Sequence, residues 1–211
     1  RRGAVEASVA LPPAERWGLV GPLLADPTRV VRIDAARHLA GTSVPTPEDA
    51  QRLAAALTEA RAAAALAADT PEGGMGLGNL ALAEGDLVAA ERAFRAVLKD
   101  APGFVPAYVN LADVMRMQGR EPEALRTLQA GLAAVPDGAT LHHALALALV
   151  RAKRLPEAAT HLERAVALAP DDAPSAVAWA LYLSDTGDGR RALAVLEAAL
   201  ARRPYDIELL M

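Results

Sequence analysis

The four histidines are the side chains of this sequence best suited to metal binding. They are His38, His142, His143 and His161. Two of them are adjacent, so both rings cannot lie on one helix face, and no acid pair stands at ligand spacing. The chain also has no cysteine, which removes thiolate ligands, thiol nucleophiles and disulfides. We therefore expect no metal site.

The acidic residues make no stronger case for catalysis. Asp171 and Asp172 follow Pro170, in a turn where acids commonly cap the next helix. The sequence shows no Ser-His-Asp order and no isolated carboxylate pair in an apolar setting. We therefore predict that the chain is not an enzyme and holds no cofactor.

A glycine-rich segment, residues 73–78, invites comparison with a phosphate-binding loop. Its sequence is Gly-Gly-Met-Gly-Leu-Gly. No strand is expected before it, and no Gly-Lys-Ser/Thr follows, so it meets neither nucleotide-binding pattern. Each glycine in a helix costs about 1 kcal/mol relative to alanine. We expect a loosened helix start, with fraying over residues 71–76.

Charge and hydropathy exclude two further classes of partner. The formal net charge is −4 and no block of five or six basic residues occurs, so we expect no nucleic-acid partner. The longest alanine-rich run, residues 53–68, is interrupted by Thr58, Glu59 and Arg61, so we expect no membrane insertion. The chain begins Arg1-Arg2-Gly3 without an initiator Met, which indicates a fragment of a longer protein.

A 34-residue repeat organises most of the chain. Four prolines mark it, at Pro102, Pro136, Pro170 and Pro204. A small residue lies twelve positions before each proline, at Ala90, Ala124, Ala158 and Ala192, and a bulky one eight before, at Phe94, Leu128, Leu162 and Leu196. Between two apolar stretches stand Gly85, Gly119 and Gly187, which predict helix ends. The pattern predicts two helices in each repeat, with the alanine allowing close approach and the proline ending the second helix.

These marks resemble the tetratricopeptide repeat, whose pattern places Trp, Leu, Gly and Tyr on the first helix, then Ala, Phe, Ala and Pro. The repeats would span residues 71–104, 105–138, 139–172 and 173–206. Departures occur at Lys153, which replaces the turn glycine, and at Gly74, which replaces the first aromatic residue. The resemblance implies an all-α fold, a right-handed superhelical solenoid of antiparallel helix pairs.

Residues 1–41 do not follow this register and instead resemble HEAT-type helices. Leu23-Leu24-Ala25-Asp26, then Val31-Arg32, Ala35-Ala36 and Leu39 carry that resemblance. Residues 42–70 would form a linker and one long bridging helix, and residues 207–211 the start of a truncated cap or fifth repeat. This order resembles the C-terminal part of bacterial multihaem cytochrome c proteins. It implies the periplasm, although the sequence itself leaves the compartment open.

In the tetratricopeptide family the first helices line a concave groove, through repeat positions 2, 5, 9, 12 and 13. The side chains that the resemblance places there as candidate partner-binding residues are Met75, Asn79, Val109, Asp113, Arg116, Met117, His143, Leu147, Arg151, Leu181, Ser184 and Asp185. Adaptable Met and Leu side chains with a few charges suit an amphipathic peptide.

Two functions remain open at this stage. The first is a protein-interaction scaffold that binds a peptide or protein segment in the groove, the partner including another domain of the same chain. The second is a structural C-terminal appendage of a larger periplasmic multihaem cytochrome; an enzyme is only a residual third. We also expect weak self-association through the C-terminal end, where an apolar face would be incompletely covered.

Overall fold

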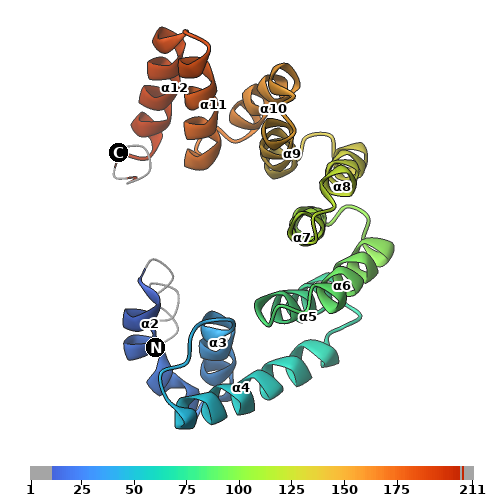
Figure 1. Ribbon diagram of the computed structural model, residues 1–211, viewed down its shortest axis with the longest axis vertical. Coiled ribbons are helices and arrows are strands. Elements are labelled where there is room, and N and C mark those ends of the chain that lie inside the picture. The colour runs from blue at the N-terminus through green and yellow to red at the C-terminus, as the bar shows by residue number, and fades with distance from the viewer. Residues whose placement is uncertain (1–10, 205, 207–211) are drawn as a thin grey trace. The chain divides into compact units, whose positions relative to one another are not determined.

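The computed structural model describes residues 11–204 and 206, and this part of the chain is helical throughout (Figure 1). It contains eleven α-helices, one 3-10 helix and, within those residues, no strand, which confirms the predicted all-α class. The contacts divide the chain into an N-terminal unit, Arg1–Ala101, and a C-terminal unit, Pro102–Met211. Most of the helix expected over residues 1–11, and the expected cap over 207–211, lie outside the described residues.

The helix bounds follow the predicted order. The N-terminal unit contains α2 (Pro13–Val20), the 3-10 helix η2 (Gly21–Ala25), α3 (Arg29–Leu39), α4 (Pro47–Leu66), α5 (Pro71–Ala83) and α6 (Leu87–Asp100). The C-terminal unit contains α7 (Val105–Met117), α8 (Glu121–Ala134), α9 (Ala139–Arg151), α10 (Leu155–Leu168), α11 (Ala173–Asp185) and α12 (Gly189–Arg202). No described helix is both long and apolar enough to cross a membrane.

The first four helices of the N-terminal unit share one core around Trp17. Apolar side chains from α2, η2, α3 and α4, together with Leu80 of α5, are buried in it. The Trp17 Nε1–H donates to Thr42 Oγ1 at 2.9 Å, so the polar edge of this buried ring is paired. At the rim, the Arg32 guanidinium of α3 makes two hydrogen bonds to the Glu59 carboxylate of α4, at 3.0 and 2.8 Å. This contact lowers the pKa of Glu59 and joins the two helices.

The glycine-rich segment forms a regular, closely packed helix from Pro71 onward, and the expected fraying over residues 71–76 stays a prediction for amide exchange. Helix α5 begins at Pro71, and the Thr70 hydroxyl accepts from the Gly73 N–H at 3.1 Å as an N-terminal cap. A Cβ at Gly74 would lie 2.5 Å from the Val97 side chain, and one at Gly78 would lie 2.3 Å from the Phe94 ring. The glycines therefore let α5 approach α6 more closely than any side chain would allow.

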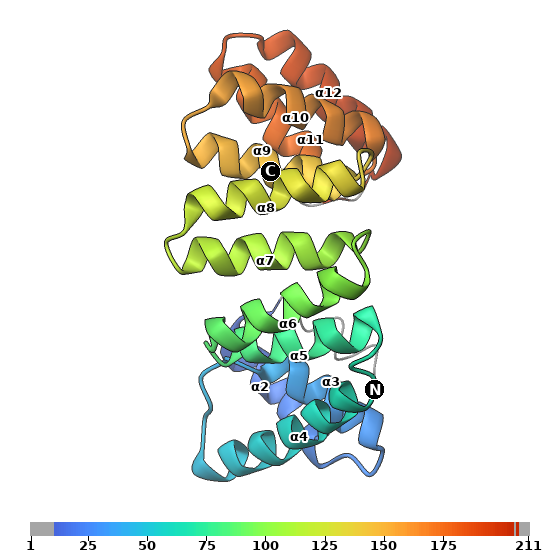
Figure 2. The ribbon, with the colours of Figure 1, turned by 90° about the vertical axis from the view of Figure 1, so that its right-hand side faces the viewer.

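In the C-terminal unit each helix packs on the next, and Figure 2 shows α7 and α8 side by side and antiparallel. The small and bulky marks of the repeats are buried, except Leu196 of the last repeat, which is only partly buried. Ala124, Leu128, Ala158 and Leu162 are at most 2% exposed. Trp179 of α11 is also buried and stacks on Tyr182 with ring centroids 5.5 Å apart. The consecutive helix pairs are those of a tetratricopeptide solenoid.

The turns between paired helices repeat one backbone conformation. Gly85, Gly119 and Gly187 have φ values of +80°, +75° and +87°, as the predicted helix ends require. Lys153 occupies the fourth such turn with a φ of +59°. It is the only non-glycine residue with positive φ in the described chain. The sequence change from glycine to lysine has therefore left the turn itself unaltered.

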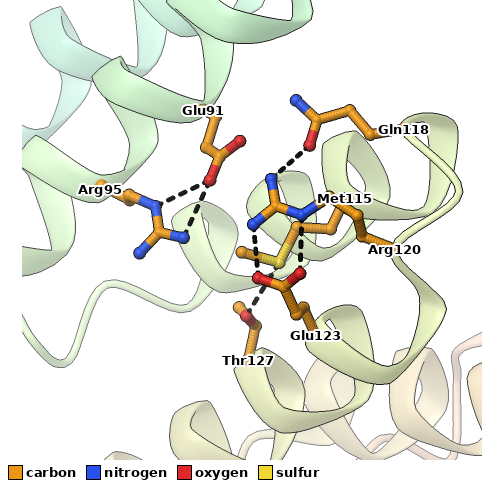
Figure 3. Close-up of polar contacts among 7 residues, drawn as sticks. All are labelled: Glu91, Arg95, Met115, Gln118, Arg120, Glu123 and Thr127. Carbon is orange, nitrogen blue, oxygen red and sulfur yellow. Dashed lines mark hydrogen bonds and ion pairs between the residues drawn. The ribbon is translucent and has the colours of Figure 1, made fainter.

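Polar contacts fasten individual turns and helix faces (Figure 3). In the C-terminal unit, the Arg120 guanidinium follows the α7 turn, donating to Gln118 Oε1 at 2.6 Å and to the Glu123 carboxylate. Thr127 Oγ1 donates to Met115 Sδ at 3.2 Å, which links α8 to α7. Separately, in the N-terminal unit, Arg95 donates to Glu91 one turn earlier on α6. Such contacts link neighbouring turns and helices within each unit.

Candidate partner-binding groove

The first helices of two successive repeats, α7 and α9, contact one another in the C-terminal unit. Between them lies a cavity of about 230 Å³. Its lining comes from α7, α8 and α9: Val109, Ala112, Asp113, Leu128, Thr140, His143, Ala144, Leu147 and Arg151. We call this cavity the α7–α9 groove.

The groove is apolar along its wall and carries charges that are already paired. Leu147 is 37% exposed and presents apolar surface to an incoming side chain. Asp113 accepts from Arg116 Nε at 2.9 Å, and Arg151 Nε donates to Glu121 Oε1 of α8 at 2.8 Å. Exposed ion pairs of this kind contribute only about 0 to 1 kcal/mol. The surface of the groove is therefore mainly apolar, with its charges paired to neighbouring side chains.

His143 is the polar group with the most constrained surroundings in the groove. Its Nδ1 lies 3.0 Å from Ser175 Oγ on α11, and Ser175 is buried. The Ser175 N–H donates to Asp172 Oδ2 at 3.0 Å, so Asp172 caps α11 as the sequence predicts. Burial lowers the pKa of His143, and the nearby Asp172 charge opposes that shift only in part. The lowered pKa favours the neutral imidazole of His143 at neutral pH.

His142 turns away from the groove and pairs with His161 of α10. The two Nδ1 atoms are 2.9 Å apart, and His142 Nε2 lies 3.0 Å from the Pro136 carbonyl oxygen. A carbonyl only accepts, so His142 Nε2 carries the hydrogen, and when both rings are neutral His142 Nδ1 accepts from His161. Burial, and then the neighbouring His142, lower the pKa of His161, against a smaller opposing contribution from Glu157. The pair fills the position expected for an aromatic packing residue.

Five of the candidate partner-binding residues line this cavity. They are Val109, Asp113, His143, Leu147 and Arg151. Arg116 and Met117 are exposed on α7, beside the groove but not in its lining. The three candidates of the last repeat, Leu181, Ser184 and Asp185, are exposed on α11 and line none of the described cavities.

The two candidates of the first repeat lie in the other compact unit. Asn79 is exposed, whereas Met75 is buried at 8% exposure. Gly74, beside Met75, occupies the position where the second repeat has Tyr108, so this helix brings a different side chain into its core. Met75 is therefore held inside the N-terminal unit, where a partner does not reach it.

Two residues that matter to the groove escape the repeat pattern. Leu128 is the bulky packing residue of α8, yet one side of it also forms part of the lining. Ser175 looks like an ordinary residue of a first helical turn, and only the stacking of α9 and α11 brings it to His143, 32 positions earlier. The only sequence signal that could have linked Ser175 to His143 is their separation of 32 residues, which is close to the repeat length. In the described residues, no three His, Asp or Glu side chains gather as a metal site would require.

Comparisons with known proteins agree with the repeat. Two tetratricopeptide repeat family models match, over residues 81–148 and 139–172. A comparison of the sequence with curated proteins gives no match. The HEAT-like and multihaem cytochrome resemblances stay predictions.

Three solved structures show the same fold at low identity. TTC0263, a thermophilic tetratricopeptide repeat protein of Thermus thermophilus, is 22% identical, with a TM-score of 0.61 over 94% of this chain and 95% of its own. MamA from Desulfovibrio magneticus RS-1 is 18% identical, with a TM-score of 0.52 over 92% and 97%. YrrB, described as having an unusual peptide-binding site, is 17% identical, with a TM-score of 0.52 over 87% and 90%. Residues 81–172 are therefore tetratricopeptide repeats, and the fold built around them is that of tetratricopeptide repeat proteins.

Proposed function

We propose that this chain is a protein-interaction scaffold whose α7–α9 groove binds a peptide or protein segment. The observation that carries the proposal is the 230 Å³ cavity between α7 and α9. Five side chains that the repeat register assigns to a partner line it, from helices that lie 34 residues apart. The cavity accommodates one or two apolar side chains, and the ion pairs at its edge leave no net charge for a partner to neutralise.

The fold relatives are consistent with a scaffold, and YrrB is described as having a peptide-binding site. For this chain we infer binding from the groove itself. The exposed candidates on α11, Leu181 among them, extend the same kind of surface along the C-terminal unit. Self-association through the C-terminal end stays a separate prediction, to be checked by light scattering at high protein concentration.

The test is a peptide selected from a displayed random library against the wild-type chain. Its affinity is then compared, by fluorescence anisotropy, for Leu147→Arg and for Leu193→Arg. Leu147 lines the groove, whereas Leu193 lies outside it on α12 and is 62% exposed. A buried cation without a partner costs several kcal/mol, so Leu147→Arg should weaken binding by about a hundredfold or more.

Leu193→Arg serves as the matched control and should bind the peptide with wild-type affinity. Circular dichroism of both variants should match the wild type, because each substituted side chain is exposed in the free protein. Equal affinity of the peptide for Leu147→Arg and for the wild type would place its binding site elsewhere and remove the proposed groove.

A further inference from the structure

The buried hydroxyl of Ser175 controls which nitrogen of His143 carries the hydrogen. Ser175 is 2% exposed, and its Oγ has one hydrogen-bond partner in the described structure, His143 Nδ1 at 3.0 Å. A hydroxyl is a single donor, and leaving that hydrogen unpaired in the interior is costly. Donation from Ser175 Oγ–H to His143 Nδ1 satisfies the hydroxyl. The reverse arrangement, with Nδ1–H donating, leaves the hydroxyl hydrogen without an acceptor.

The tautomer of His143 follows from this constraint. With Nδ1 accepting, a neutral imidazole carries its only hydrogen on Nε2. That atom has no partner in the described chain and is not among its buried unpaired atoms. Since His143 lines the α7–α9 groove, its Nε2–H is an accessible donor beside the apolar wall.

We propose that Ser175 is a positioning residue that fixes His143 as an Nε2–H donor, so that the groove selects an extended segment carrying a bulky aliphatic side chain beside an unpaired carbonyl oxygen. This inference rests on the proposed function of the groove. Within an α-helix the backbone carbonyls are used by the helix itself, so a free carbonyl next to a leucine-like side chain belongs to an extended chain. The internally paired charges of Asp113 and Arg151 require no charge on that segment.

The first test needs no ligand. Nitrogen NMR of the histidine rings distinguishes the protonated from the unprotonated ring nitrogen, and wild-type His143 should show a single Nε2–H tautomer. In Ser175→Ala the two nitrogens should move toward one another as the Nδ1–H form becomes populated. Ser43→Ala is the matched control, because Ser43 is an exposed serine between α3 and α4, outside the groove and its candidate partner-binding residues. Its His143 signals should equal those of the wild type.

The second test uses N-acetyl-leucine dimethylamide, which has an isobutyl group and carbonyl acceptors but no dimethylamide N–H. Its binding, followed by chemical-shift titration of the groove residues, should be about two- to tenfold weaker in Ser175→Ala than in the wild type or Ser43→Ala. Isoamylamine, with a similar alkyl group but only a donor head, should bind the wild type and Ser175→Ala equally.

The outcomes separate the two proposals. A wild-type His143 in the Nδ1–H form, or in an even mixture, overturns the inference whatever binds in the groove. The expected tautomer with equal binding of N-acetyl-leucine dimethylamide to the wild type and Ser175→Ala overturns the selection step. The expected tautomer without any shift of groove residues by that probe refutes the proposed groove, while the role of Ser175 in fixing the imidazole stands.

Discussion

Replacing Lys153 by glycine should stabilise the protein, although it removes a side chain. Lys153 ends α9 with a φ of +59°, in the turn that glycine occupies in the other three repeats. Its N–H donates to the Val150 carbonyl at 2.9 Å, and the next N–H, of Arg154, donates to the Leu149 carbonyl at 2.9 Å. These two bonds define a helix end that needs a left-handed residue. The chain therefore holds a lysine in a conformation that its Cβ disfavours.

The expected gain in the free energy of unfolding follows from three terms, one that favours glycine and two that oppose it. A non-glycine residue in the left-handed region costs about 1–2 kcal/mol. Glycine offsets about 0.5–1 kcal/mol of this gain, because a glycine gives the unfolded chain more conformational entropy, which is lost on folding. The Lys153 charge also favours the negative end of α9 by about 0.3 kcal/mol or more. The net gain from Lys153→Gly is then about 0.5 kcal/mol.

Urea unfolding followed by circular dichroism measures this gain as an increase in the midpoint at an unchanged slope. Lys153→Ala removes the charge but keeps the strained φ, so its midpoint should not rise. Gly119→Lys should lower the free energy of unfolding by about 0.5 kcal/mol, the reverse of Lys153→Gly, since a Cβ there meets nothing within 4 Å and the same backbone and charge terms apply. A Lys153→Gly midpoint equal to that of Lys153→Ala would refute the argument from backbone strain.

Two further predictions concern packing and pH. Gly78→Ala should destabilise the protein by about 1–3 kcal/mol, because its Cβ would lie 2.3 Å from the Phe94 ring. Gly76→Ala is the control: its Cβ would have its nearest neighbour at 3.4 Å, so it should be neutral or stabilising. Thermal unfolding compares the two variants. Because burial lowers the pKa values of His143 and His161 from 6.5, the unfolded chain binds more protons below that pH. The free energy of unfolding should therefore fall as pH drops through 6.5 and level off below the folded pKa values. In a double variant, His143→Gln with His161→Gln, the urea midpoint should change less with pH between about pH 7.5 and 5.5.

The helix pairs were predictable because each mark acts locally. A proline ends a helix through its own ring, and a glycine such as Gly119 supplies positive φ through its missing Cβ. Neither effect depends on distant contacts, so spacing alone predicts the order of the helices. Lys153 marks the limit of this local rule. It adopts the positive φ of the turn although a lysine, unlike glycine, prefers negative φ.

The glycines of α5 could not be interpreted from spacing. By helix propensity alone residues 73–78 predict a weak helix, because propensity takes no account of the side chains packed beside them. Gly78 faces Phe94, which is 0% exposed in the core of the N-terminal unit. Close packing of α6 on α5 offsets the intrinsic cost of glycine, and only the distance between the two helices reveals it.

The groove illustrates the same division between register and contact. Repeat positions 5 and 9 point to Val109 and Asp113 on α7 and to His143 and Leu147 on α9, because a fixed register places equivalent side chains on equivalent faces. Whether such a face forms a cavity depends on its neighbours. The lining is completed by Leu128 from α8, a residue that the register assigns to packing. The binding face of a helix can thus be predicted from one repeat, whereas the cavity needs the side chains of the helices packed beside it.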